Sequence, residues 1–228
     1  MHSDDMLLKK EAASLAALSA VVRRLRGEGG CPWDRAQTHA TLRRYLIEET
    51  YEVVEAIDKE DPTALREELG DLLLQILFHA DMERERGRFD LADVADEERE
   101  KMIRRHPHVF GEERAETVLA SWEENKDREK GRATLGERLA TIPPSLPALM
   151  RAVKLLERGG AQLPQSAVGD PAAWERHLSL SGVRGSEDPL LAAGYYFLSA
   201  VAALRSEGID PEEALTYAIR RLTEEITG

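Results

Sequence analysis

Two short acidic segments carry the residue types that bind metal ions. "EETYE" contains Glu48, Glu49 and Glu52, and "ELGD" contains Glu68 and Asp71. In each segment two carboxylates are three residues apart, which places both on one side of a helix. Carboxylate oxygens favour Mg²⁺ or Mn²⁺ over zinc or copper. The pattern by itself leaves two interpretations open: a site for divalent cations, or solvated acids and structural ion pairs.

The first acidic helix, expected over residues 44–57, has an apolar face bordered by carboxylates. At 100° per residue, Glu49 lies on the edge of that face and Glu52 is next to it. Glu48 and Glu55 sit further round. The face is formed by Leu42, Leu46, Val53 and Ile57. We therefore expect Glu49 and Glu52 to border a cleft and Glu55 to be a surface residue.

The second acidic helix, expected to begin at Asp61-Pro62, has a narrow polar strip between two apolar faces. The strip consists of Glu68, Asp71, Gln75 and His79, and the faces consist of Leu65, Leu69, Leu72 and Ile76, and of Leu74, Leu77 and Phe78. Burying a bare charge is costly, so the two acids need basic partners or cations. His79 is expected to be a hydrogen-bonded histidine rather than a ligand. The two acidic helices are expected to lie antiparallel.

The elements that position these residues are predicted to be helices throughout. Almost every apolar run has helical period, which favours an all-α fold. Besides the acidic pair, helices are expected over about 3–26, 91–105 and 115–130, with "CPWDRAQTHA" as a loop and a break at "HPHVFG". "TIPPSLP", residues 141–147, has the composition of a boundary, and three or four further helices follow it.

Composition excludes several classes of protein. The chain has 228 residues, a formal net charge of −12 and a single cysteine, Cys31. One cysteine excludes an intramolecular disulfide framework and a multi-cysteine zinc site, and it fits a reducing cytoplasm. The acidic charge argues against a general nucleic-acid-binding surface, and no segment approaches the ~18 apolar residues of a membrane span. We expect a cytoplasmic protein that binds neither nucleic acid nor membranes.

The order of four motifs resembles one known family. "EETYE" followed by "ELGD" resembles the EExxE…ExxD signature of MazG-type nucleoside triphosphate pyrophosphohydrolases. "CPWDRAQT" precedes the signature, and "RRHPHVFG" and "SWEENK" follow it in the family's order. The resemblance extends over about residues 15–131. It implies an antiparallel bundle of the all-α NTP pyrophosphatase type, a homodimer, and Mg²⁺-dependent cleavage of a nucleoside triphosphate between its α and β phosphates.

The resemblance also implies a role for individual residues. It assigns the metal ligands to Glu49, Glu52, Glu68 and Asp71, and nucleotide contacts to Lys101, Arg105, Trp122 and Lys126. Glu48 is implied to be a further site acid, either a ligand or the base that orients water. Trp33 and Gln37, in "CPWDRAQT", are expected either to approach the nucleotide or to lock the loop.

The second half of the chain is predicted to be a degenerate second MazG-like repeat. "AAGYYFLSAVAAL" aligns with "ELGDLLLQILFHA" with Gly194 opposite Gly70, but Ala192 and Tyr195 then stand opposite Glu68 and Asp71. Acids are correspondingly fewer: residues 1–130 have 31 acidic and 21 basic side chains, and residues 131–228 have 12 and 10. We predict a catalytic domain over 1–131 and a domain for packing, dimerisation or regulation over 132–228.

Two alternatives to an enzyme that hydrolyses a broad range of canonical or damaged nucleoside triphosphates stay open at this point. One is a pyrophosphatase restricted to dUTP, dCTP or oxidised dGTP, and another is a non-enzymatic helical interaction protein with a relic metal site. A di-iron carboxylate bundle is excluded, because that site needs paired Glu-x-x-His motifs and no glutamate of the two acidic segments is followed by histidine three residues later.

Overall fold

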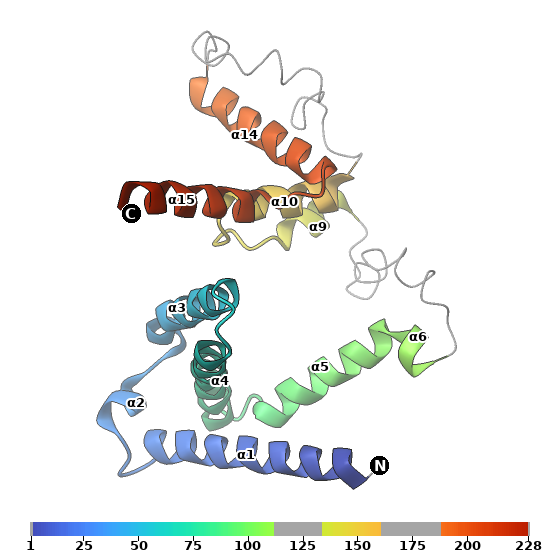
Figure 1. Ribbon diagram of the computed structural model, residues 1–228. Helices are drawn as coiled ribbons and strands as arrows, with labels where there is room; N and C mark the ends of the chain where they lie inside the picture. The colour runs from blue at the N-terminus through green and yellow to red at the C-terminus, as the bar shows by residue number, and fades with distance from the viewer. Residues whose placement is uncertain (1, 112–133, 161–187, 228) are drawn as a thin grey trace. The chain divides into compact units, whose positions relative to one another are not determined.

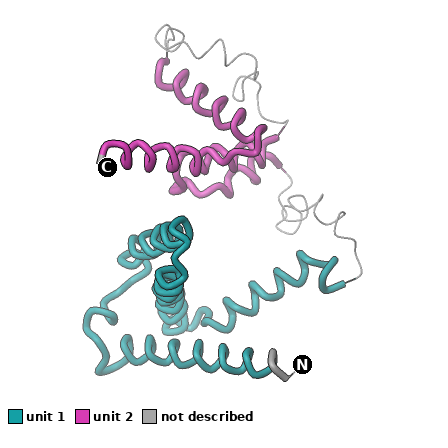
Figure 2. Tube along the Cα trace, in the orientation of Figure 1, with its two compact units in different colours: residues 1–118 teal, residues 119–228 magenta. Residues whose placement is uncertain are grey.

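The computed structural model describes residues 2–111, 134–160 and 188–227 (Figure 1). The chain forms two compact units, residues 1–118 and 119–228, which are described separately (Figure 2). The described residues form helices and turns without strands, which confirms the predicted all-α fold. None of the described helices is long and apolar enough to span a membrane.

The described part of unit 1, residues 2–111, contains two long helices, two of medium length and two short ones. These are α1 (His2–Arg26), α2 (Pro32–Ala36), α3 (His39–Asp58), α4 (Pro62–Glu85), α5 (Leu91–Arg105) and α6 (Pro107–Phe110). The expectation of plain loops at "CPWDRAQTHA" and "HPHVFG" is wrong in part, because α2 and α6 lie there. Each begins with a proline, whose fixed φ suits the first turn of a helix.

The α3–α4 hairpin is set by side chains at its two helix starts. Thr38 accepts a hydrogen bond from the backbone N–H of Thr41 at 3.2 Å and so caps α3. Asp61 accepts from the N–H groups of Thr63 at 2.8 Å and Ala64 at 3.1 Å, and these bonds lower the pKa of the Asp61 carboxyl. Asp61 is therefore the cap that the sequence predicts for α4.

Contacts along the hairpin show that α3 and α4 are antiparallel, as predicted. His39 at the start of α3 meets His79 late in α4, whereas Glu49, further along α3, meets Asp71, nearer the start of α4. Residues of α3 that are far from the connecting turn therefore contact residues of α4 that are also far from it. Residues of α3 nearer to the turn contact residues of α4 that are nearer to it. This register brings the two acidic segments face to face.

The core of unit 1 lies where α1, α3 and α4 meet. Val22 from α1, Leu42 from α3 and Leu77, Phe78 and Met82 from α4 form its buried cluster. The expected Leu65-to-Ile76 face is not core in this unit: Leu69 is 48% and Ile76 is 40% exposed. On α3, Ile57 is likewise 54% exposed. No described helix of unit 1 covers these three side chains.

Unit 2 contains α9 (Leu135–Ala140), α10 (Ala148–Gly159), α14 (Pro189–Ser206) and α15 (Pro211–Thr227). Helix α10 packs against the other three, and Val153 and Val201 are buried between the helices. The proline-rich stretch 141–147 joins α9 to α10 inside this unit, so the expectation of a boundary there is wrong. Helix α9 packs on α10 and so belongs to the same unit.

The predicted domain division after residue 131 and the division between the two units after residue 118 both fall within 112–133, outside the described residues. The helix expected over 115–130 lies there as well. Gly70 and Gly194 are both inside helices, α4 and α14, as their alignment requires. The repeat itself stays a prediction.

Candidate metal centre

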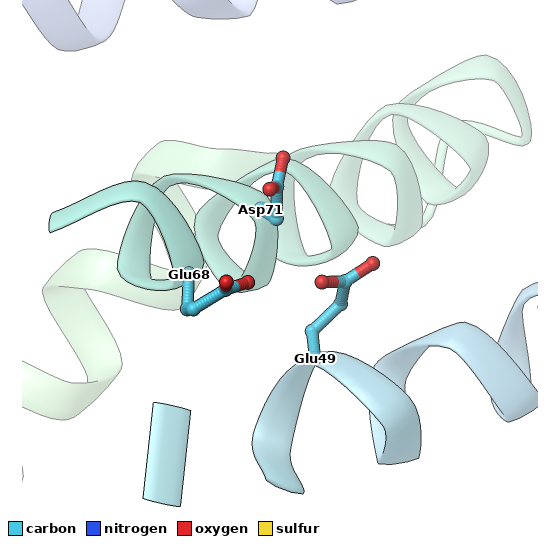
Figure 3. A group of neighbouring side chains, drawn as sticks. All are labelled: Glu49, Glu68 and Asp71. Atoms are coloured by element: carbon cyan, nitrogen blue, oxygen red, sulfur yellow. The ribbon is translucent and has the colours of Figure 1, made fainter. Parts of the chain in front are cut away.

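Three carboxylates from the two acidic helices converge in unit 1. Glu49 comes from α3, and Glu68 and Asp71 come from successive turns of α4 (Figure 3). Each offers a carboxylate oxygen, and the three oxygens lie within 4.8 Å of one another. All three side chains are half-buried. Among the described residues, this is the one group of three or more such side chains spaced to hold a metal ion.

Crowding changes the acidity of the cluster. Burial, followed by the charges of Asp71 and Glu52, raises the pKa of Glu49 to about 6. Burial, with the charges of Glu52 and neighbouring acids, also raises the pKa of Glu68. A raised carboxyl pKa means that the negative form is disfavoured at this position. The cluster is therefore held together by the fold against its own electrostatic repulsion.

The carboxylates fit a divalent cation by the chemistry of their donors. None of the ion pairs formed within the described ranges involves Glu49, Glu68 or Asp71. A half-buried acidic group without a basic partner needs another source of positive charge. Three oxygen donors on two fixed helices supply part of a hard-ion coordination shell and leave positions for water or substrate oxygens.

The other glutamates of α3, Glu48, Glu52 and Glu55, are not among the three converging carboxylates. Glu52 is exposed, and its charge contributes to raising the pKa of both Glu49 and Glu68, so it lies close to the cluster. Glu48 is exposed and is not one of the three converging carboxylates. Glu55 is exposed and forms an ion pair with Lys59 at 2.6 Å, which confirms the prediction of a surface residue.

The basic residues assigned to the nucleotide are not brought to the cluster. Lys101 and Arg105 lie in the last two turns of α5, whose second half leads away from the α3–α4 pair (Figure 1). Lys101 is half-buried and pairs with Glu98 on its own helix. The predicted contacts at Trp122 and Lys126 lie outside the described residues.

Trp33 and Gln37 stabilise the corner between α2 and α3. The Gln37 side chain donates to the Trp33 carbonyl oxygen at 2.9 Å and accepts from the Thr41 hydroxyl at 2.8 Å. The Trp33 ring packs edge-on against Tyr45 with centroids 6.2 Å apart, and it remains 54% exposed. These contacts support the loop-locking role, and the exposed ring leaves the predicted nucleotide contact as a prediction.

A buried ion pair was missed by the sequence analysis. Arg26, at the end of α1, donates to Asp81 at 3.0 Å and to Glu85 at 2.7 Å, both on α4. Its third bond, 3.0 Å long, goes to the carbonyl oxygen of Asp34 in α2. Arg26 is 7% exposed, so it fastens three helices together from inside. Nothing in the local pattern of any one helix could predict this partnership.

A second missed network surrounds the predicted hydrogen-bonded histidine. His79 Nδ1 lies 2.6 Å from His39 Nδ1, which confirms that His79 is hydrogen-bonded. His39 Nε2 in turn lies 2.5 Å from Oε1 of Glu83. Glu83 also binds Arg86 and Arg88. The only available signal was that His79 extends the acidic strip, since its partner is 40 residues away along the chain.

Comparison with known proteins agrees with this geometry. The MazG nucleotide pyrophosphohydrolase domain matches residues 37–110, which include α3 to α6 and all three converging carboxylates. A Thermotoga maritima protein named nucleoside triphosphate pyrophosphohydrolase/pyrophosphatase MazG is 40% identical over 225 residues, covering 94% of this chain and 85% of that protein.

Two further relatives, each named nucleoside triphosphate pyrophosphohydrolase, are matched over less of their length. The Escherichia coli K12 protein is 50% identical over 145 residues, covering 62% of this chain and 55% of that protein. The Mycolicibacterium smegmatis protein is 39% identical over 206 residues, covering 85% of this chain and 62% of that protein. With a relative matched along nearly its whole length and the domain matched over the acidic hairpin, the chain belongs to the MazG family.

Proposed function

We propose that this chain hydrolyses a nucleoside triphosphate to a nucleoside monophosphate and pyrophosphate, using a divalent cation. The observation that carries the proposal is the convergence of Glu49, Glu68 and Asp71 from two helices, inside the segment that matches the MazG domain. The names of the relatives support the reaction class. That the substrates range from canonical to damaged nucleotides is also proposed, and the names of the relatives do not bear on it.

We assign the cation to Glu49, Glu68 and Asp71, with Glu52 as a fourth ligand. Mg²⁺ fits this donor set because it prefers oxygen ligands and usually keeps several waters, and Mn²⁺ is the expected substitute. Once bound, the cation supplies charge neutralisation for the triphosphate and lowers the pKa of a coordinated water.

The bond changes follow from the products. A water oxygen forms a bond to the α-phosphorus, the bond from that phosphorus to the bridging oxygen breaks, and pyrophosphate leaves with the bridging oxygen. Glu48 is the proposed acceptor of the water proton. It is exposed and adjacent in sequence to Glu49, so its carboxylate is free to approach a substrate bound at the cluster.

The nucleotide contacts are proposed for Lys101, Arg105, Trp122 and Lys126, with Trp33 as a further candidate for the base. Arginine and lysine bind phosphate oxygens, and tryptophan stacks on bases. Because α5 leads away from the α3–α4 pair, we propose that Lys101 and Arg105 reach a nucleotide held by a second copy of the chain.

A homodimer is part of the proposal. Ile47, Tyr51 and Val54 form one stripe on α3 with exposed fractions of 52%, 59% and 47%. Leu69 and Ile76 are exposed on α4, the helix packed beside it. Exposed apolar patches commonly mark protein–protein interfaces.

The test is an assay of pyrophosphate release over the ribonucleotides, the deoxyribonucleotides and oxidised analogues. We expect release that requires Mg²⁺ and disappears with EDTA. Release confined to dUTP, dCTP or oxidised dGTP would show a narrow enzyme, and a flat profile would show a broad one. No release from any nucleotide, with Mg²⁺ or Mn²⁺ present, would contradict the proposed activity.

A further inference from the structure

Two histidines connect the start of α3 to the last third of α4. The His39 and His79 rings lie edge to edge, with centroids 4.9 Å apart and planes 5° from parallel, and their Nδ1 atoms are 2.6 Å apart. On its other side, His39 Nε2 contacts Oε1 of Glu83 at 2.5 Å. Glu83 is buried, and Arg86 and Arg88 also hold its carboxylate.

The number of protons that this contact can hold follows from its donors and acceptors. Two nitrogens at hydrogen-bond distance need one proton between them. In the neutral pair, His39 donates Nε2–H to Glu83 and accepts at Nδ1 from His79. Adding one proton fills Nε2 of His79, and the proton between the two Nδ1 atoms can then lie on either ring. Adding a second proton sets two N–H groups against each other at Nδ1, so the contact must open.

The surroundings of the pair oppose the second proton. Although burial acts to raise it, hydrogen bonds from His39, Arg86 and Arg88 lower the pKa of Glu83, so its carboxylate stays charged beside His39. Burial, and then the neighbouring His39, lower the pKa of His79. Nε2 of His79 is buried and has no hydrogen-bond partner among the described residues.

Other charged groups on the neighbouring helices are engaged elsewhere. From α1, Arg26 binds Asp81 and Glu85 rather than the histidines. At the start of α5, Asp90 and Asp93 form a capping box with backbone N–H groups. The balance at the histidine pair is therefore set by Glu83 together with Arg86 and Arg88.

We propose that the His39–His79 contact is a proton-sensitive latch that fixes the start of α3 against α4 and so positions the carboxylate cluster. Helix α3 is continuous from His39 to Asp58 and is held at its far end by the turn into α4. Opening the contact loosens the start of α3, which the buried Leu42 still anchors in the core, and the turn into α4 acts as the pivot. Glu49, which lies between the pivot and the latch, then moves relative to Glu68 and Asp71.

The latch itself is independent of any activity, whereas its effect on cation binding rests on the proposed function. The direct test is an NMR titration of the imidazole nitrogens in the metal-free full chain, from about pH 8 to about pH 4.5, which spans the ordinary histidine pKa. We expect His39 and His79 to titrate as a coupled pair with two steps more than about one pH unit apart. Two independent curves at the ordinary pKa would overturn the latch.

Two variants and one control variant separate the effect of charge from that of structure. In Glu83→Gln the carboxylate charge is lost and the hydrogen-bond acceptor is kept, so the upper step should fall by about 1 pH unit or more. Glu97→Gln, the same change at an exposed site on α5, should leave both steps unchanged. In His79→Gln the side chain still donates to His39, and only one step should remain. If Glu83→Gln shifts neither step, the proposed charge balance is wrong.

The link to the cluster is tested with Mg²⁺ alone. Acidification should raise the dissociation constant for Mg²⁺ in both proteins. The rise should be larger in the wild type than in His79→Gln, because only in the wild type does protonation open the contact and loosen the start of α3. Equal rises in the two proteins, alongside a coupled histidine titration, would show a latch that does not position the carboxylates. No Mg²⁺ binding at all would contradict the proposed function while leaving the NMR result to decide the latch.

Discussion

Glu49 on α3 and Asp71 on α4 place carboxylate oxygens within 4.8 Å of each other, although a turn separates their helices along the chain. Burial and the charge of Asp71 are the two largest causes that raise the pKa of Glu49 to about 6. At neutral pH the metal-free protein thus holds a repulsive pair in its most closely packed hairpin. This arrangement costs stability unless a cation binds.

The first prediction concerns stability as a function of pH without metal. The pKa of Glu49 is raised in the folded state, so the folded protein binds the proton more readily than the unfolded chain. The contribution of Glu49 should therefore lower the free energy of unfolding as the pH rises from the ordinary glutamate value through about 6. His79 acts oppositely: its pKa is lowered, so its contribution is lost as the pH falls below the ordinary histidine value. Urea unfolding of wild type and Glu49→Gln across this range measures the first contribution, and an unchanged pH profile in the variant would contradict it.

The second prediction concerns metal binding. Above pH 6 a divalent cation should replace the repulsion by attraction and stabilise the folded state. At a concentration 100 times the dissociation constant, binding adds about 2.7 kcal/mol. For a chain of this size that corresponds to a rise in Tm of about 5–10 °C. Scanning calorimetry with Mg²⁺ and with EDTA measures it, and the rise should shrink below pH 6 as Glu49 becomes protonated. No shift at saturating Mg²⁺ would count against the site.

The third prediction compares two acidic residues. Asp71→Asn keeps the shape of a proposed ligand but removes its charge, so pyrophosphate release should fall by at least about 100-fold, because loss of even an outer-shell partner costs 10–100-fold. The same variant should be more stable than wild type without metal, because one repelling charge is gone. Glu55→Gln, at an exposed position paired with Lys59, should retain activity. Activity that survives Asp71→Asn in pure protein would point to a contaminating enzyme.

The sequence predicts the features of this fold that depend on neighbouring residues better than those that depend on residues far apart along the chain. Local signals were sufficient for helix limits: Asp61-Pro62 begins α4 and Leu91–Arg105 is α5, as expected. The antiparallel pairing of the acidic helices also followed from their short connection. Leu69 and Ile76 lie on the predicted apolar face of α4 but are exposed, because periodicity shows that a face is apolar but not which surface covers it.

The candidate site likewise has features that the sequence predicts and features that it does not. Glu49, Glu68 and Asp71 share helix faces at fixed spacings, so their convergence needed only the hairpin. The bonds of Arg26 to Asp81 and of His39 to His79 join residues far apart in sequence, and neither partner has a pattern that names the other. The positions of Lys101 and Arg105 depend on where α5 points after it leaves α4, which helical periodicity does not determine.

The fourth prediction tests the proposed dimer. Tyr51→Glu places a charge in the middle of the exposed stripe on α3 and should convert a dimer to monomers, because a buried unpaired charge is costly at an interface. Its effect on a single chain should be within about 0.5 kcal/mol, since Tyr51 is 59% exposed there. Met6→Glu, at a 71% exposed position on α1, is the matched control. Sedimentation velocity measures the outcome, and a wild-type protein that is monomeric at all concentrations would refute the dimer.

The fifth prediction concerns the buried arginine. Arg26→Met should lower the free energy of unfolding by about 3–5 kcal/mol, because it leaves the 5% exposed Asp81 carboxylate with only Arg84 as a partner. Lys9→Ala removes an exposed pair with Asp5 and should cost only about 0.3–0.5 kcal/mol. Combining Arg26→Met with Asp81→Leu should restore much of the loss, since no buried charge then lacks its partner. Urea unfolding of the four proteins decides this, and a double variant no more stable than Arg26→Met would mean that packing around the guanidinium, rather than its charge, holds α1 on α4.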